Sequence, residues 1–202
     1  RKLSFNRIHV WSIGLVLCLM SCNTTKFVPQ GEYLLNKANI KVEDTKEVAV
    51  SDLKNYLQQK QNTEILGFLK LQLGIYNTAS LDTAKWTSKN ARRIGEAPVI
   101  YATELTDRSM VQLRKAMQNK GYFTAQVDTT ITVKDRKVNI TYHVTAGEPY
   151  IIRRYRVGFE HEELKQIAQD QRRLISEGMQ FDVDMLNQER QRIARAMRRN
   201  GC

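Results

Sequence analysis

The stretch FTAQVDTTITVKDRKVNITYHVT, residues 123–145, decides the fold. Apolar and polar residues alternate over 123–132 and again over 137–145, which is the pattern of two half-buried β-strands. Lys134-Asp135-Arg136 separates the two runs and predicts a turn, so the strands form an antiparallel hairpin. In the second strand one face carries Val138, Ile140, Tyr142 and Val144.

A helix is predicted on the N-terminal side of this hairpin, because residues 106–117 place apolar side chains at helical spacing and Gly121 follows. The other elements are expected in chain order: a strand over 33–43, a helix from Ser51, a helical stripe over 61–80, an irregular polar segment over 81–93, and a short extended segment over 97–101 that Pro98 confines to an edge. Together they predict an α+β fold, with helices packed on one face of a small mixed sheet.

The order of elements begins again after residue 147. Tyr150 and the apolar positions after it match those from Tyr33 onward at a constant offset of 117, and the helix ending at Gly201 matches the one ending at Gly121 at an offset of 80. The difference gives the first copy about 37 additional residues. The second copy reaches no hairpin, so we expect one complete and one truncated module and a longer natural chain.

The N-terminus reads as an export signal. Basic residues precede an apolar run over 8–20 that is short for a membrane-spanning helix. The run closes on Leu19, Met20, Ser21 and Cys22, which resemble the lipobox of bacterial lipoproteins. We therefore expect residues 1–21 to be a cleaved signal peptide, Cys22 to carry a diacylglyceryl thioether and a further acyl chain, and residues 22–32 to be the lipidated N-terminus and its tether. The alternative is an uncleaved anchor helix.

Composition excludes several classes of protein. The chain has 202 residues, 42% of them hydrophobic, which fits a globular protein. Its net charge of +11 invites a nucleic-acid role, but the basic residues are dispersed and export removes the opportunity. No glycine-rich phosphate loop or HExxH motif is present, and the three histidines are scattered. We therefore expect no enzyme, no metal site and no cofactor apart from the lipid on Cys22.

Four stretches carry a family resemblance: CNTTKFVPQGEYLL at 22–35, RRIGEAPV at 92–99, NKGYF at 119–123 and ERQRI at 189–193. Together they resemble the lipid-anchored TamA-like proteins of Bacteroidota (TamL), within the BamA/TamA superfamily. The resemblance implies POTRA modules of strand, helix, helix and hairpin, one at 33–147 with the insertion and the N-terminal half of another at 148–202. Family members continue into a C-terminal membrane β-barrel that this chain does not contain.

The resemblance implies a scaffold on the periplasmic side of the outer membrane, anchored by lipid, that acts in outer-membrane protein assembly and translocation. Its partners would be unfolded outer-membrane proteins or an inner, TamB-like periplasmic protein, bound by addition of a strand to a sheet edge. The alternative is an independent periplasmic lipoprotein that binds a partner or envelope ligand and has no barrel.

Two surfaces are candidate sites. The candidate partner-binding strands are represented by Val99, Ile100, Tyr101, Val138, Ile140 and Tyr142. The candidate membrane-surface residues are Arg190, Arg192, Arg195, Arg198 and Arg199. The alternatives are that the strand edges pack against a neighbouring module, and that the arginines form a solvated helix face.

Overall fold

The computed structural model describes residues 24–66, 69–80, 85–169 and 172–201. The predicted signal peptide, lipobox and Cys22 lie outside these residues. Two compact units are present: unit 1 is Arg1–Asn39, Gln59–Leu105 and Thr130–Thr141, and unit 2 is Ile40–Gln58, Thr106–Thr129 and Tyr142–Cys202.

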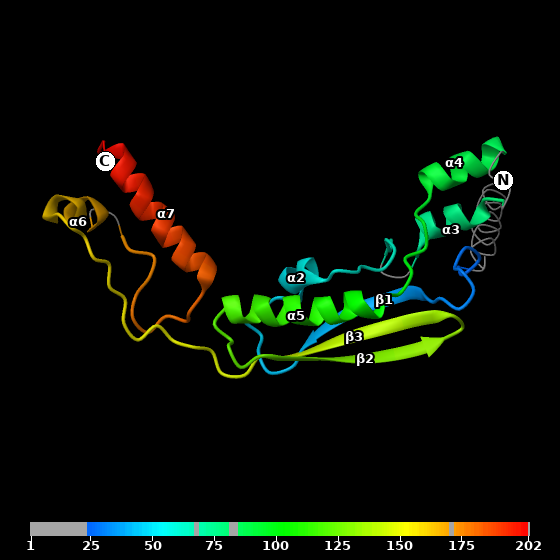
Figure 1. Cartoon of the computed structure of the whole chain (residues 1–202), viewed down its shortest axis with the longest axis horizontal. Helices are drawn as coiled ribbons and strands as arrows, with labels where there is room; N and C mark the ends of the chain where they lie inside the picture. The colour runs from blue at the N-terminus through cyan, green and yellow to red at the C-terminus, as the bar shows by residue number, and fades with distance from the viewer. Residues whose placement is uncertain (1–23, 67–68, 81–84, 170–171, 202) are drawn as a thin grey trace, which may run out of the picture. The chain divides into compact units, whose positions relative to one another are not determined.

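Three strands form one sheet: β1 (Leu34–Val42), β2 (Gln126–Lys134) and β3 (Lys137–Thr145). The order is β1-β3-β2, so β3 is the central strand (Figure 1). Every second residue of β3 from Val138 to Val144 is buried, as the alternation in its sequence predicts. The predicted hairpin and the predicted α+β class are both confirmed.

The hairpin turns on two residues, Asp135 and Arg136, with φ of 49° and 58°. Two central residues with positive φ define the type I′ turn, whose twist matches that of the flanking strands. Arg136 is held there from both ends, because its carbonyl accepts the Leu34 N–H at 2.9 Å and its guanidinium donates to Val28 O at 2.8 Å. These contacts explain why a residue without glycine's freedom occupies the position.

The long helix is α5 (Thr103–Asn119), which runs along the sheet (Figure 1). It ends in a Schellman motif: Gly121 N–H donates to Gln118 O at 3.0 Å, and Tyr122 N–H donates to Met117 O at 3.0 Å. Gly121 has φ of +91°, which this motif requires. In unit 2 the buried core includes Leu53, Leu113, Met117, Tyr122, Val127, Tyr142 and Val144.

Two predicted helices are much shorter than expected. The helix expected from Ser51 is only α2 (Val50–Leu53) followed by a 3-10 turn at Lys54–Tyr56. Among the described residues of the stripe over 61–80, α3 (Leu71–Thr78) is the helical part. Ile65 and Leu69 form an antiparallel bridge instead, and Leu66 between them has φ of 57°. The apolar residues Ile65, Leu66 and Leu69 therefore do not extend the helix α3.

The prediction that residues 81–93 are irregular is wrong, because α4 (Trp86–Ile94) occupies most of them. α4 packs on α3 without an apolar stripe. Ser88 Oγ accepts the Ser80 N–H at 3.0 Å, and Arg92 donates to Ser80 O at 3.2 Å. Gly95 closes the pair: a Cβ there would lie 2.5 Å from Tyr76 N, so only glycine permits this approach.

The segment after residue 147 belongs to unit 2. Its described residues hold α6 (Glu162–Gln169) and α7 (Val183–Arg199), and α7 begins at Asp182, whose carboxylate accepts from Asp184 N at 2.7 Å and Met185 N at 3.0 Å. The match to residues 33–43 leads to the expectation of a strand from Tyr150 onward, but the described residues over 150–160 form no strand. A single antiparallel bridge joins Ile151 to Gln180. None of the helices described is long and apolar enough to cross a membrane.

Candidate functional site

A three-stranded sheet has two outer edges, and in this chain the edge of β1 is closed. Leu35 N–H donates to Val99 O at 2.8 Å, and Tyr101 N–H donates to Tyr33 O at 2.8 Å. Between these bonds Ile100 forms an antiparallel bridge with Leu34. Residues 99–101 therefore pair with the start of β1 as a short additional strand.

Amide side chains close the far side of this short strand. Asn62 Oδ1 accepts the Val99 N–H at 3.1 Å, and Asn62 is fully buried. Gln59 donates from Nε2 to Ile100 O, and its Oε1 accepts the Ala102 N–H at 3.2 Å. Because these side chains satisfy the backbone groups that another strand would use, the short strand cannot extend the sheet further.

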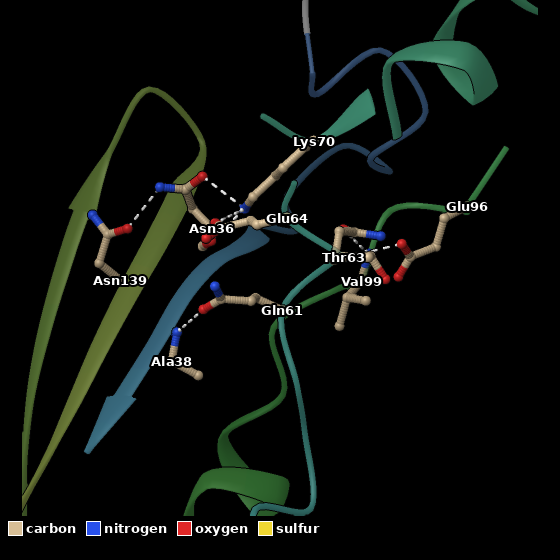
Figure 2. A network of polar contacts seen from close by, with 10 residues as sticks. Asn36, Ala38, Gln61, Thr63, Glu64, Lys70, Glu96, Val99 and Asn139 are labelled. Atoms are coloured by element: carbon tan, nitrogen blue, oxygen red, sulfur yellow. Dashed lines mark hydrogen bonds and ion pairs between the residues drawn. The ribbon is translucent and has the colours of Figure 1, made fainter. Parts of the chain in front are cut away.

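A polar network closes the middle of β1 (Figure 2). Gln61 Oε1 accepts the Ala38 N–H at 2.6 Å, and Lys70 Nζ donates to Asn36 O and, at 3.1 Å, to Asn36 Oδ1. Lys70 also lies 3.6 Å from Glu64, and burial lowers the pKa of Lys70 below its usual value. Side chains thus stand where a neighbouring strand would otherwise bond.

The outer edge of β2 is different, since within the described residues no other strand or bridge pairs with it. The two-residue turn makes Lys134 and Lys137 a hydrogen-bonded pair, so the N–H groups of 127, 129, 131 and 133 point away from β3. Ile131 and Val133 are 41% and 56% exposed. This strand offers both backbone donors and apolar side chains to a partner.

The predicted partner-binding residues do not form this open edge. Val99, Ile100 and Tyr101 are half-buried, and their backbone is paired as described above. Val138, Ile140 and Tyr142 are core residues of the central strand, paired on both sides. Alternation in β3 marks the buried face of that strand and says nothing about which strand of the sheet lies outermost.

The five arginines predicted to contact a membrane surface differ in burial. Arg190, Arg195, Arg198 and Arg199 are exposed on α7. Arg192 is buried: it binds Glu189 through two hydrogen bonds of 2.8 Å and donates to Ala168 O at 2.9 Å. Hydrogen bonding from Arg192 lowers the pKa of Glu189, which also accepts the Leu174 N–H at 3.1 Å. Arg192 is therefore a structural residue of the α6–α7 pair and is unavailable to a membrane.

Sequence reasoning missed the side chains that close β1, namely Gln59, Gln61, Asn62 and Lys70. The sequence gives one sign of them, the run QQKQN at 58–62, in which four of five residues carry a side-chain amide and none is apolar. Amide groups carry both donors and acceptors, so they can replace a strand's backbone.

The model of the POTRA family, described as "Surface antigen variable number repeat", matches residues 37–147, which is more than half of the chain. The chain belongs to the POTRA family. Among solved structures, this POTRA chain is similar to POTRA domains 3–5 of BamA from Haemophilus influenzae, with 12% identity, 84% of this chain and 88% of that chain covered, and a TM-score of 0.30. No curated protein matches.

Proposed function

We propose that this chain is the periplasmic POTRA region of a lipid-anchored outer-membrane protein of the BamA/TamA superfamily, similar to TamL. In this role it is a non-catalytic scaffold for outer-membrane protein assembly and translocation. One complete module then occupies residues 33–147, and another begins at 148–202. The outer edge of β2 binds extended segments of client proteins or of a periplasmic partner.

The contrast between the two sheet edges carries this proposal. Side chains from 59–70 and the short strand 99–101 close the edge of β1, whereas β2 ends the sheet with Ile131 and Val133 exposed. Proteins usually blunt an edge strand that is not used, because an open edge pairs readily with other chains. Because the edge of β1 is blunted and the edge of β2 is open, β2 is the strand on which an extended partner segment can pair. Pairing through the backbone suits a protein with many β-rich clients.

Proline at position 131 is expected to impair this binding. Ile131 presents its N–H outward, so Ile131→Pro removes one donor for an incoming strand and leaves the β2–β3 bonds in place. A synthetic ten-residue peptide with the alternating sequence of a barrel strand is the probe, measured by fluorescence anisotropy. Losing one hydrogen bond of roughly 1 kcal/mol should weaken its binding by about fivefold.

Ile131→Thr is the matched control, because it changes the side chain but keeps the backbone donor. It should bind the peptide more tightly than Ile131→Pro does. Circular dichroism verifies that both variants remain folded. Equal affinity of the parent protein and Ile131→Pro for the peptide would contradict the proposed edge.

The lipid anchor is tested separately, by mass spectrometry of the protein recovered from a bacterium that processes lipoproteins. The expected N-terminal residue is Cys22 carrying acyl chains, and Cys22→Ser should abolish both the acylation and the cleavage. An intact N-terminus, or a free thiol on Cys22 of the mature chain, would refute the anchor while leaving the strand-binding result unaffected.

A further inference from the structure

The polar stretch that follows Cys22 is not a loose tether but is packed on the α3–α4 pair, within unit 1. Lys26 Nζ donates to Asn77 O at 3.0 Å and to Ala79 O at 2.7 Å, at the end of α3. The Phe27 ring meets Tyr76 edge to face at 5.4 Å, and the Arg92 guanidinium of α4 lies 5.4 Å from the same ring. The predicted spacer is therefore docked where it was expected to be free.

This docking limits the distance between the anchor and α3. Val28 is buried with Leu34 and Leu73, and Asn77 Nδ2 donates to Thr24 O at 3.3 Å. Cys22 precedes Thr24 by two residues, and two residues of chain span about 7 Å at most. A lipid on Cys22 would hold the α3–α4 pair next to the membrane surface.

The outer face of α4 has the chemistry of such a surface. Trp86, Lys89 and Arg93 follow one another at i, i+3 and i+7, and they therefore share a face of the helix. Trp86 is 76% exposed and Ile94 at the other end is 60% exposed. Lys85, Lys89 and Arg93 are exposed, and no acidic residue occurs from Thr83 to Gly95. Interfacial helices combine such cations with a tryptophan and an aliphatic residue.

We propose that α4 lies against an anionic lipid surface, with Trp86 and Ile94 entering the headgroup region and Lys85, Lys89 and Arg93 contacting lipid phosphates. The position of α4 at that membrane rests on the proposed anchor at Cys22, whereas its affinity for anionic lipid rests on its own residues. This surface differs from the α7 arginines that the sequence suggested.

The test uses tryptophan fluorescence, since the chain has two tryptophans, Trp11 and Trp86. The whole chain with Trp11→Phe is reconstituted into vesicles of phosphatidylethanolamine and phosphatidylglycerol that contain brominated acyl chains. We expect the emission of Trp86 to shift to the blue and to be quenched by the bromines. In vesicles of phosphatidylcholine alone the quenching should fall to less than half.

Reversing the charge of basic residues on α4 should weaken the quenching of Trp86 in the anionic vesicles. Lys89→Glu with Arg93→Glu is expected to remove most of the quenching, while the matched reversal Arg195→Glu with Arg198→Glu on α7 should leave it unchanged. Circular dichroism verifies the fold of each variant. Absence of Trp86 quenching in the parent protein overturns the proposal. Equal quenching in the α4 and α7 reversal variants also overturns it, and a protein partner would then be the alternative ligand of the exposed face of α4.

The anchor and the surface can fail independently in this experiment. Mass spectrometry of the same sample reports whether Cys22 is acylated. An acylated chain with unquenched Trp86 refutes the α4 surface and leaves the proposed anchor standing. A chain that lacks the acyl groups but whose Trp86 is quenched, with loss on reversal of Lys89 and Arg93, refutes the anchor and supports the α4 surface.

Discussion

Replacing Arg192 with methionine is expected to lower the free energy of unfolding of the α6–α7 pair by about 3–5 kcal/mol. The substitution removes both hydrogen bonds to Glu189, which is only 1% exposed to solvent. It also removes the hydrogen bond to Ala168 O. A buried carboxylate without its partner must stay charged at high cost or take up a proton. Chemical denaturation, together with hydrogen exchange of the α7 amides, measures the loss.

The same variant should respond to pH differently from the parent. In the parent, hydrogen bonds from Arg192 lower the pKa of Glu189, so the stabilisation is complete above the unfolded value of about 4.3 and is lost as the pH falls through the lower folded value. Without Arg192, the largest cause that lowers the pKa of Glu189 is gone while burial still opposes the charged form, so the variant gains less stability than the parent as the pH rises. The difference in free energy between parent and variant should therefore grow from about pH 4 to pH 7.

Two controls separate this effect from a general loss of charge. Arg195→Met removes an exposed arginine from the same helix and should change stability by less than about 0.5 kcal/mol. The double variant Glu189→Leu with Arg192→Met removes both buried charges and should recover much of the loss. If the single and double variants are equally destabilised at neutral pH, the loss does not come from leaving the buried Glu189 carboxylate without its partner.

The pair also shows what a sequence pattern can and cannot reveal about charge. Glu189 and Arg192 stand three apart on a helix, so their proximity could be predicted. Their burial could not, because it depends on residues 168 and 174 folding over that side of α7. Five arginines in ten residues look alike in sequence, and tertiary contacts single out one of them.

The hairpin and α5 could be predicted because each buries one face against a core, and burial imposes a period of two or 3.6 on apolar residues. The same reasoning failed for α4. Its contacts with α3 depend on Ser88, Arg92 and the absence of a side chain at Gly95, and none of these adds to a hydrophobic period. A helix held by polar contacts and one close glycine resembles a loop in sequence.

The edges of the sheet were the part of the site least accessible to sequence. Alternation identifies the buried face of a strand but not its neighbours, so β3 and β2 could not be ranked as centre and edge. The closure of β1 rests on side-chain amides of Gln59, Gln61 and Asn62, whose partners are 23 to 43 residues distant in the chain. Polar residues at such separations leave no periodic trace.

Replacing Gly121 with alanine is expected to detach residues 148–182 from the end of α5, within unit 2. Gly121 O accepts the Tyr150 N–H at 2.9 Å, and Tyr150 O accepts the Phe181 N–H at 2.8 Å. A Cβ on Gly121 would lie 2.4 Å from Phe181 O, which is backbone and cannot rotate away. The positive φ adds strain of about 1–2 kcal/mol, so we expect a total loss of about 2 kcal/mol or more.

Gly178→Ala is the matched control for this prediction. Gly178 has φ of +87°, close to that of Gly121, but nothing lies within 4 Å of where its Cβ would stand. It should therefore show the backbone strain alone, and the difference between the two variants isolates the contact with Phe181. Hydrogen exchange should lose protection at the amides of Tyr150 and Phe181 in Gly121→Ala more than in Gly178→Ala. Equal protection in the two variants would mean that the close approach of Gly121 to Phe181 does not hold this segment to α5.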